Sequence, residues 1–250
     1  MRNGEKKNKM PKVPLTIVIP ARNEEESIVS IFKEIKKKVK TPHKTLVIVD
    51  LVPGEKTHEV VRKYMKEDET VGLILNKSKV KSFANALRLG FNKANSIAVI
   101  PVMADMSDRL SDIDKMYVLI NKGWDIACGS RYMKGGKKKG GPKLQSFLSK
   151  FVCLSLHYIV WVPTKDVSDS FKMYNKNAIK KIYIDPCKGF EISMDITLHA
   201  FFKGARIIEI PTVWMGRTKG KSKFKYASRF PKYFAIYSWA IKERLATFTK

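Results

Sequence analysis

Short runs of branched apolar residues alternate with longer amphipathic segments in the first half of the chain. Buried strands are predicted at residues 15–20 (LTIVIP), 45–50 (TLVIVD), 71–75 and 97–102, where apolar residues follow one another without alternation. Helices are predicted between them, at residues 28–39, 57–65 and 79–93, from apolar positions at helical spacing. This order of elements predicts an α/β fold with a doubly wound, Rossmann-like, mostly parallel sheet and helices on both faces.

The second half of the chain has a less regular pattern. Strands are predicted at residues 124–130, 167–174 and 205–211, a helix at 192–202, and a helical, aromatic tail at 233–248. A further apolar stripe at residues 144–161 permits two interpretations. It is either part of the core or an interfacial helix on a membrane, with Lys143, Lys150, Tyr158 and Trp161 at its borders. The chain shows no repeat and no linker, which predicts a single domain.

Polar residues follow the predicted strands at the positions where each strand ends. Ala21-Arg22-Asn23-Glu24 follow the first strand, Asp50 ends the second, and Asp105 and Asp108 follow the strand at 97–102. Ligands of doubly wound sheets bind outside the carboxyl ends of the strands. Carboxylates at such an edge predict a divalent metal site, and a solvated Asp-rich turn is the alternative.

The charge of the chain is strongly positive and unevenly distributed. The 250 residues include 49 Lys and Arg against 23 Asp and Glu, which gives a net charge of +26. No acidic residue lies between Asp125 and Asp166, or between Glu209 and Glu243. These basic tracts predict an anionic partner, such as phosphates or an acidic membrane surface. No nucleic-acid-binding motif is present, so nucleic acid is not an expected partner.

Three other features narrow the classes of protein. Three widely spaced cysteines indicate a reducing compartment. The polar, basic start of the chain predicts a disordered arm and lacks the apolar core of a signal peptide. The GGKKKGG segment at 135–141 lacks the residues of a P-loop. It is interpreted either as a flexible, solvated loop or as a mobile loop that closes over an anionic substrate.

Six segments, in this order, resemble family 2 glycosyltransferases of the GT-A fold, especially polyprenyl-phosphate sugar transferases such as the dolichyl-phosphate mannosyltransferases. They are TIVIPARNEEESI (16–28), IVD (48–50), VMADMSD (102–108), GSRYMKGG (129–136), SDSFKMYNKNAI (168–179) and GRTKGKSKFK (216–225). The resemblance implies an inverting transfer of mannose or glucose from GDP-mannose or a UDP-sugar to a polyprenyl phosphate. It also implies a cytoplasmic enzyme held peripherally at the inner face of the membrane, with a membrane-embedded protein as a candidate partner.

The resemblance also assigns roles to residues. The implied nucleotide-binding residues are Pro20, Ala21, Arg22, Glu24, Asp50 and Ser82. The implied Mg²⁺ or Mn²⁺ ligand is Asp105, with Ser107 and Asp108 as further candidates. The implied contacts of the acceptor phosphate are Arg131, Ser170 and Lys172. The implied contacts of the diphosphate from the opposite side are Arg217, Ser222 and Lys223. The implied catalytic set is Asp105, Arg131, Arg217 and Lys223.

The chain departs from the family pattern at several positions. Met103 replaces the first Asp of the metal motif, Leu51-Val52-Pro53 replace D-G-S after Asp50, and Lys172 replaces an Arg. Two alternatives therefore stay open. One is transfer to a sugar hydroxyl of a surface polysaccharide, with Asp195 or Glu191 as the base. The other is a non-catalytic protein that binds nucleotide sugars.

The resemblance also implies the boundaries of the domain and of its flanking segments. A disordered arm is expected at residues 1–13 and the transferase domain at 14–225, with a nucleotide-sugar half at 14–108 and an acceptor half at 109–225. An amphipathic helix is expected at 226–250.

Overall fold

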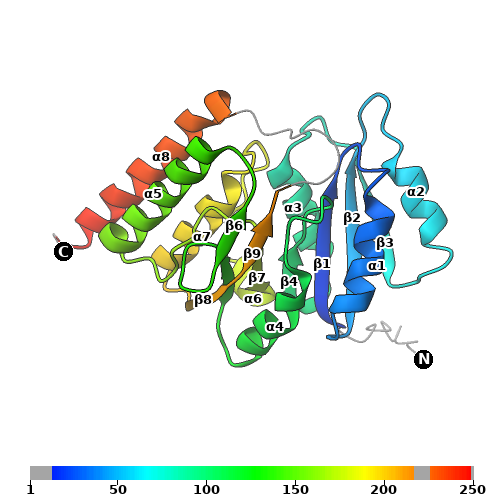
Figure 1. The fold of residues 1–250 in the computed structure, drawn as a ribbon, viewed down its shortest axis with the longest axis horizontal. Helices are drawn as coiled ribbons and strands as arrows, with labels where there is room; N and C mark the ends of the chain where they lie inside the picture. Colours follow the sequence, from blue (N-terminus) through cyan, green and yellow to red (C-terminus); the bar gives the residue numbers. More distant parts are fainter. Residues whose placement is uncertain (1–12, 217–225, 249–250) are drawn as a thin grey trace, which may run out of the picture.

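The computed structural model describes residues 13–216 and 226–248 (Figure 1). The strands of the main sheet are β1 (Val13–Ala21), β2 (His43–Asp50), β3 (Val71–Asn76), β4 (Ser96–Pro101), β5 (Ile126–Ser130), β7 (Lys172–Asn175) and β8 (Ile207–Pro211). Two short strands, β6 (Lys137–Lys139) and β9 (Val213–Met215), pair separately. The helices are α1 (Ile28–Lys38), α2 (Thr57–Tyr64), α3 (Phe83–Lys93), α4 (Ile113–Asn121), α5 (Lys143–Val160), α6 (Lys176–Ile179), α7 (Ile192–Phe202) and α8 (Tyr226–Ala246), with a 3₁₀ turn η1 (Leu110–Asp112).

The main sheet has seven strands in the order β3-β2-β1-β4-β7-β5-β8. Strands β1 to β4 run parallel, β7 runs antiparallel to both of its neighbours, and β8 is parallel to β5. The predicted α/β class and mostly parallel sheet are therefore confirmed. One sheet crosses both predicted halves of the chain, and the division at residue 108 stays a prediction.

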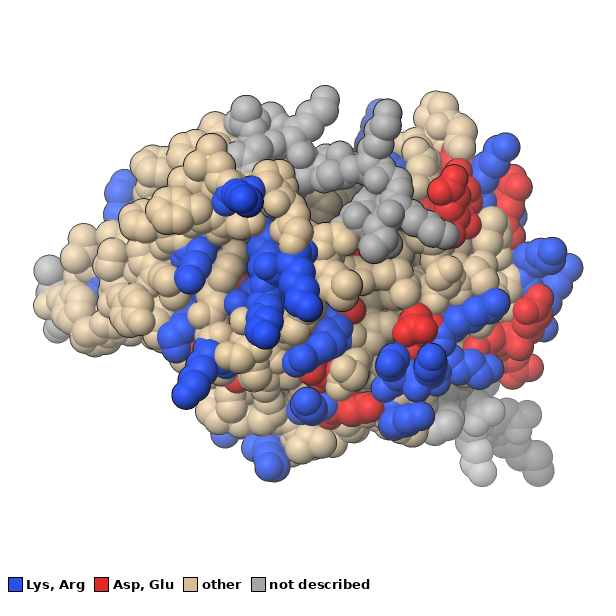
Figure 2. All heavy atoms as spheres, in the orientation of Figure 1, with Lys and Arg blue, Asp and Glu red and all other residues tan. Residues whose placement is uncertain are grey.

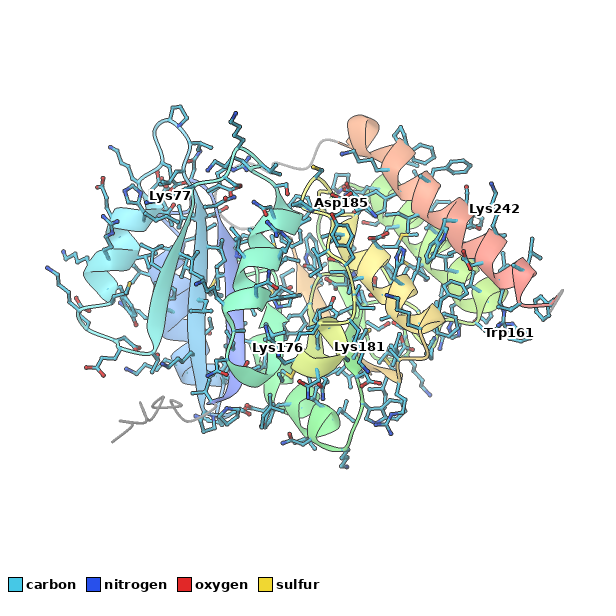
Figure 3. The ribbon with its side chains drawn as sticks, turned by 180° about the vertical axis from the view of Figure 1, so that it is seen from behind. Lys77, Trp161, Lys176, Lys181, Asp185 and Lys242 are labelled. Carbon is cyan, nitrogen blue, oxygen red and sulfur yellow. The ribbon has the colours of Figure 1, made fainter. Side chains whose placement is uncertain are left out.

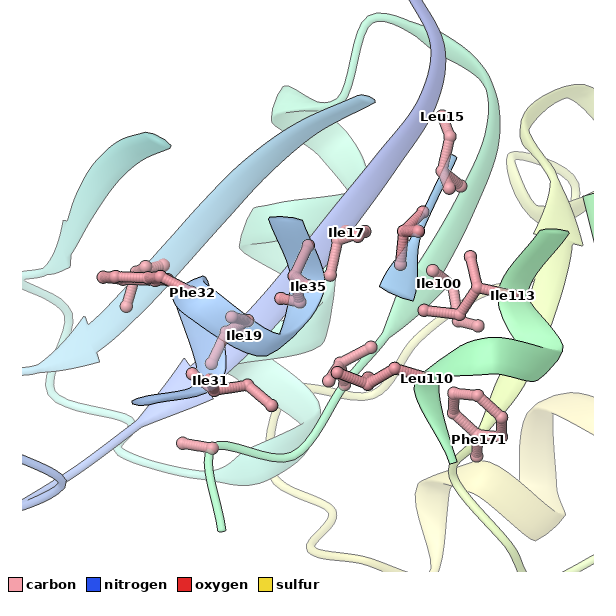
Figure 4. Close-up of a cluster of buried hydrophobic side chains, with 14 of the residues drawn as sticks. Leu15, Ile17, Ile19, Ile31, Phe32, Ile35, Ile100, Leu110, Ile113 and Phe171 are labelled. Atoms are coloured by element: carbon pink, nitrogen blue, oxygen red, sulfur yellow. The ribbon is translucent and has the colours of Figure 1, made fainter. Parts of the chain in front are cut away.

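The first half folds around strands that are buried on both faces. In β1, Leu15, Ile17 and Ile19 pack against α1 and α4, as Figure 4 shows, whereas Val18 faces α3 on the other side of the sheet. Adjacent side chains of a strand point to opposite faces, so a strand covered on both sides must be apolar at nearly every position. The uninterrupted apolar runs of the sequence have this cause.

A second layer of helices covers the acceptor half. Met194 and Leu198 of α7 pack against α5 and α8, while Ile192 and Ile196 face the sheet. Helix α7 is therefore enclosed on two sides, which explains why its sequence is apolar nearly all round. In Figure 1, α5 and α8 lie side by side as the outermost helices of this half.

Several local predictions are corrected. The loop predicted at 135–141 contains β6, in which Lys137 N donates to Thr212 O at 2.9 Å and Gly216 N donates to Lys139 O at 2.7 Å. These bonds pair the segment with β9 and contradict a flexible loop, although Lys137 and Lys139 are exposed to solvent. The strand predicted at 167–174 enters the sheet only from Lys172, and the helix predicted from residue 79 begins at Phe83. Val13 belongs to β1 and not to the basic arm, whose other residues lie outside the described part of the chain.

The core interpretation of the stripe at 144–161 is wrong for most of its residues. Leu144, Phe147, Phe151 and Ile159 are exposed, with exposed fractions of 50–71%. The buried side of α5 is formed by other residues, namely Cys153, Leu156 and Val160. Among the residues that the structure describes, no helix is both long and apolar enough to cross a membrane.

The contact between α3 and β1 yields a test of the packing. A Cβ atom at Gly90 would lie 2.4 Å from Cγ1 of Val18, which is buried in β1. Gly90→Ala should therefore lower the free energy of unfolding by about 1 to 3 kcal/mol, although alanine is the better helix former. Chemical denaturation measures this change. Asn92→Ala on the exposed side of α3 is the matched control, and equal stability of the two variants would contradict the close approach.

Candidate active site

Asp50 joins three strand ends at the carboxyl edge of the sheet. It is 5% exposed, accepts a hydrogen bond from Asn76 Nδ2 at 2.6 Å, and forms an ion pair with Arg22. Arg22 also donates to Lys81 O at 2.8 Å, which ties the loop after β1 to the loop before α3. Pro20 and Ala21 lie at the end of β1, in register with Ile48 and Val49 of β2. The predicted nucleotide-binding residues Pro20, Ala21, Arg22 and Asp50 are thus brought together.

The loop after β1 is fixed by backbone contacts to the loop after β2. Glu24 N donates to Thr57 Oγ1 at 2.9 Å, and Thr57 N donates to Oε1 of the buried Glu55 at 2.6 Å. Asn23 adopts a left-handed conformation with φ of 51°, which asparagine tolerates better than most residues. The position of Glu24 therefore depends on a contact between two segments that are 33 residues apart in the sequence.

Ser82 has a structural role in addition to the predicted one. Its Oγ accepts a hydrogen bond from Asn85 N at 3.0 Å and caps α3, and it bonds to the Pro186 carbonyl. Asn76 was not predicted as a site residue. Its place in the sequence corresponds to that of Asp50, because each is the polar residue that ends a strand of the parallel sheet.

The acidic turn after β4 is closed by its own carboxylates. Asp108 Oδ2 accepts from Met103 N at 2.9 Å, and Asp105 Oδ1 accepts from Ser107 N at 3.1 Å. Met215 N donates to Ser107 O at 3.0 Å, which attaches the turn to β9. Burial, followed by the neighbouring carboxylate of Asp169, raises the pKa of Asp108 well above its usual range.

Two residues that the sequence did not single out anchor the far side of this turn. Arg109 pairs with the fully buried Asp112 at 2.6 Å and donates to Pro211 O at 2.8 Å. Thr212 Oγ1 also donates to Asp112 Oδ2, at 2.8 Å. The turn that carries Asp105 is therefore held against β8 and β9, which are about 100 residues away in the sequence.

The donor atoms of the acidic turn fit a hard divalent cation. Carboxylate and hydroxyl oxygens of Asp105, Ser107 and Asp108 are the atom types that Mg²⁺ or Mn²⁺ prefers. Among the described residues, no group of three or more His, Cys, Asp or Glu side chains is placed to hold a metal ion. A metal here would therefore use few protein ligands, which agrees with Met103 at the position of the first Asp.

Arg131 lies in a buried ionic cluster at the end of β5. Its Nε donates to Asp166 Oδ2 at 2.6 Å, its Nη2 donates to Asp166 Oδ1 at 2.8 Å, and Nε lies 3.2 Å from Asp169 Oδ2. The side chain of Arg131 is 9% exposed and that of Asp166 is fully buried. Burial by itself would raise the pKa of Asp166, but the Arg131 guanidinium outweighs it and holds that pKa below its usual range.

The other residues predicted to contact the acceptor phosphate surround this cluster. The side chain of Lys172 is buried, and its ammonium group donates to Val167 O at 3.0 Å and to Asp169 O. The carbonyl oxygen of Ser170 accepts a hydrogen bond from Lys172 N at 2.8 Å. The structure thus brings Arg131, Ser170 and Lys172 together, with both cations already bonded to protein oxygens. The predicted phosphate contacts stay a prediction.

The candidate bases lie in a cavity between α7 and α8, with a volume of about 440 Å³. Asp195 Oδ1 is 2.7 Å from Lys188 Nζ and 3.4 Å from His199 Nδ1. Glu191 Oε1 accepts from Gly189 N at 2.6 Å and lies 3.8 Å from Lys232 Nζ. Figure 3 places Asp185, a further lining residue, near the start of α7. Arg217, Ser222 and Lys223 lie outside the described residues.

The family model described as Glycosyl transferase family 2 matches residues 16–183. A dolichol-phosphate mannosyltransferase of Pyrococcus furiosus is 26% identical over 226 residues, which are 89% of this chain and 62% of that protein. The chain therefore spans less than two thirds of this relative. A polyprenol monophosphomannose synthase of Mycolicibacterium smegmatis is 22% identical over 234 residues, which are 92% of this chain and 88% of that protein.

The fold is also found among solved structures. Glucosyl-3-phosphoglycerate synthase from Mycobacterium tuberculosis, in complex with Mn²⁺, UDP and glucosyl-3-phosphoglycerate, superposes with a TM-score of 0.65 at 12% identity. The match covers 94% of this chain and 79% of that one. At this identity the likeness shows the fold alone, which is GT-A, as the sequence predicted.

The Arg131–Asp166 pair leads to a stability prediction. Asp166→Asn leaves a buried guanidinium without its full counter-charge and should lower the free energy of unfolding at pH 7 by about 3 kcal/mol or more. The folded-state pKa of Asp166 lies below the unfolded value of about 3.9. The stabilisation of the folded state by the charged carboxylate is therefore complete above about pH 3.9. It is lost as the pH falls through the folded-state pKa.

Denaturant unfolding of wild type and Asp166→Asn at pH 7 and at about pH 3 measures this difference, which should shrink at the lower pH. Glu26→Gln, at an exposed carboxylate, is the control and should change stability by less than about 0.5 kcal/mol. Equal effects of the two substitutions at pH 7 would show that the buried pair does not stabilise the fold.

Proposed function

Because this chain belongs to glycosyl transferase family 2, we propose that it transfers a hexose, with inversion, from a nucleotide-diphosphate sugar to a polyprenyl phosphate. The observation that carries this proposal is the convergence of Arg22, Asp50 and Asn76 at the strand edge next to the acidic turn of Asp105. Such an edge offers a carboxylate for the donor groups of a nucleoside and, beside it, oxygens for the metal that accompanies a diphosphate.

The donor is proposed to lie with its nucleoside near Asp50 and its diphosphate toward Asp105. Asp50 accepts hydrogen bonds from the nucleobase or ribose, and Pro20, Ala21, Arg22 and Glu24 form the adjacent wall. GDP-mannose or a UDP-sugar is the proposed donor. When bound, Mg²⁺ or Mn²⁺ supplies positive charge that neutralises the leaving diphosphate. Arg217, Ser222 and Lys223 are proposed to contact the diphosphate from the opposite side.

The acceptor phosphate is proposed to approach Arg131, Ser170 and Lys172. Asp166 occupies Nε and Nη2 of Arg131, so a phosphate would bind through the remaining Nη1. The carboxylates fix the guanidinium plane in advance, which reduces the cost of ordering it when the acceptor binds. A phosphate oxygen is already anionic and needs no strong base. The residues would thus act by positioning the reactants and neutralising charge.

A second candidate function is transfer to a sugar hydroxyl. The cavity of about 440 Å³ between α7 and α8 places Asp195 and Glu191 beside a space that a small acceptor could enter. A hydroxyl acceptor needs a general base, and these carboxylates are the candidates. Asp195 is already paired with Lys188 at 2.7 Å, however, and Glu191 with the backbone of Gly189, so both are engaged in local contacts.

The proposed location follows from the acceptor. Polyprenyl phosphate resides in a membrane, and the charge of +26 favours an anionic membrane surface. We propose peripheral association with the cytoplasmic face of the membrane, with a membrane-embedded protein as a candidate partner.

A transfer assay with phase extraction tests the function. The protein is incubated with Mn²⁺, radiolabelled GDP- or UDP-sugars and polyprenyl phosphate, and the mixture is extracted with organic solvent. Label in the organic phase is the expected result. Label only on glycan acceptors would support the hydroxyl reaction, and nucleotide binding without any transfer would indicate a non-catalytic protein.

The acidic turn is tested in the same assay. Asp105→Ala should reduce transfer by at least about 100-fold, because it removes the carboxylate proposed to hold the metal. Glu69→Ala, at an exposed carboxylate just before β3 and therefore at the opposite edge of the sheet, is the control and should leave transfer unchanged. Undiminished transfer by Asp105→Ala would refute the assignment of Asp105.

A further inference from the structure

The charges of the ionic cluster at the end of β5 balance one another. Arg131 donates through Nε and Nη2 to Asp166, and its Nε also lies 3.2 Å from Asp169 Oδ2. The Lys172 ammonium is buried and donates to two backbone carbonyl oxygens. Two buried cations therefore face two buried carboxylates. A phosphate that approaches this cluster meets hydrogen-bond donors but no surplus of positive charge.

Lys138 in the middle of β6 is a cation without such compensation. It is half-buried, whereas Lys137 and Lys139 on either side of it are exposed. Its Nζ lies 5.3 Å from the centroid of the Trp214 ring, and within the described part of the chain it has no hydrogen-bond or ion-pair partner. Successive side chains of a strand point to opposite sides, so Lys138 is directed away from its two neighbours.

The ammonium group of Lys138 lies within electrostatic range of the ionic cluster. Burial lowers the pKa of Lys138 below its usual range, and the nearby Arg131 guanidinium lowers it further, while Asp166 and Asp169 act in the opposite direction. Figure 2 shows Lys and Arg side chains gathered on the face over β6. Lys138 is thus the half-buried member of a cationic surface next to the cluster.

The pairing of β6 with β9 places Lys138 between the two parts of the proposed active site. Lys138 lies opposite Trp214 in the register of the two strands. The backbone N–H groups before and after Trp214 donate to Ser130 O at 3.1 Å and to Ser107 O at 3.0 Å, respectively. The ribbon that carries Lys138 is therefore fixed at one point to the end of β5, next to the ionic cluster, and at another to the acidic turn.

Glycines on both sides of β6 fix this placement. A Cβ atom at Gly136 would lie 2.8 Å from the carbonyl carbon of Arg131, so the chain turns back directly over the end of β5. Gly141 has φ of 79°, and a Cβ atom there would lie 3.7 Å from the Trp214 ring and 3.9 Å from Cε of Lys138. The backbone thus holds Lys138 in position before any ligand binds.

We propose that Lys138 is a further contact of the acceptor and that its ammonium supplies the positive charge that a prenyl phosphate monoester requires. A half-buried ammonium without an anionic partner is unfavourable, and a bound phosphate removes that cost. The Trp214 ring stabilises the ammonium while the site is empty. The inference rests on the proposed function, because it adds a residue to the proposed acceptor site.

Calorimetric titration with geranyl phosphate, a water-soluble prenyl phosphate, tests this contact without sugar nucleotide or metal. Lys138→Met keeps an unbranched side chain against Trp214 and removes the charge. It should weaken binding at least about tenfold, because a charge-assisted hydrogen bond to the phosphate is lost. Lys138→Arg should recover most of the affinity. Undiminished binding by Lys138→Met, or no recovery by Lys138→Arg, would overturn the proposal.

The matched control removes the same charge from the same strand. Lys139→Met lies one residue further along β6 with its side chain exposed. It should bind geranyl phosphate as wild type does, and an equal loss in this variant would overturn the proposal in favour of the overall charge of the segment. Urea midpoints of the two variants should match that of wild type.

Amine labelling of wild type gives a measurement that does not depend on the folding of any variant. The protein is treated with limiting acetic anhydride, and the acetylation of each lysine is followed by peptide mass spectrometry. Geranyl phosphate should slow the labelling of Lys138 at least about fivefold and leave Lys139 unchanged, because an ion-paired ammonium is protonated and covered. Unchanged labelling of Lys138 would contradict the contact. Equal protection by inorganic phosphate at the same concentration would overturn the prenyl phosphate as the ligand in favour of free phosphate.

Steady-state kinetics separates this inference from the proposed function. In the transfer assay, Lys138→Met should raise KM for polyprenyl phosphate about tenfold and leave KM for the sugar nucleotide unchanged. The reverse pattern would assign Lys138 to the donor diphosphate and overturn the proposal. Absence of transfer by wild type would refute the function, whereas the binding of geranyl phosphate would still decide the role of Lys138. Transfer together with equal binding by wild type and Lys138→Met would leave the function intact and overturn the contact.

Discussion

The burial of β1 on both faces is the constraint from which the rest of this structure follows. Ile17 and Ile19 need helices on one side of the sheet and Val18 needs a helix on the other, so crossover helices must cover both faces. Crossovers of one hand keep β2, β1 and β4 parallel, and their carboxyl ends then meet at a single edge. Arg22, Asp50 and the turn of Asp105 come together there because of the topology.

In the second half of the chain, a buried ionic cluster fixes the positions of several segments, as apolar packing does in the first half. An unpaired guanidinium at the position of Arg131 would be costly, and Asp166 and Asp169 supply its counter-charges from the loop before β7. The chain enters the sheet only after this loop, at Lys172. The same loop faces Ser149 and Cys153 of α5, so the ionic cluster also positions the outer helix. Burial raises the pKa of the Cys153 thiol to about 11, which makes it a packing residue and a poor nucleophile.

The enclosure of α7 has a consequence at the surface. Because Ile192 and Ile196 face the sheet while Met194 and Leu198 face outward, a further layer of helices is required to cover α7. Helices α5 and α8 form that layer, and their own outer sides are left without a protein partner in the described part of the chain. The layer that completes the core therefore also presents an apolar surface. Such a surface would suit a family 2 glycosyltransferase whose proposed acceptor is a lipid.

The sequence alone determined the fold class, the order of the elements from β1 to β4 and the family, because periodicity and strand-end residues depend on local order along the chain. It also predicted that Asp50 and Arg22 would lie at one edge, since parallel strands place their ends together. Only the tertiary structure decided that the lysines of residues 137–139 form a strand, that Arg131 is held by Asp166 and Asp169, and that Phe147 and Phe151 face outward. Each of these depends on contacts between segments distant in the sequence. An apolar stripe shows that a helix has an apolar face, but what covers that face is set by the elements packed around it.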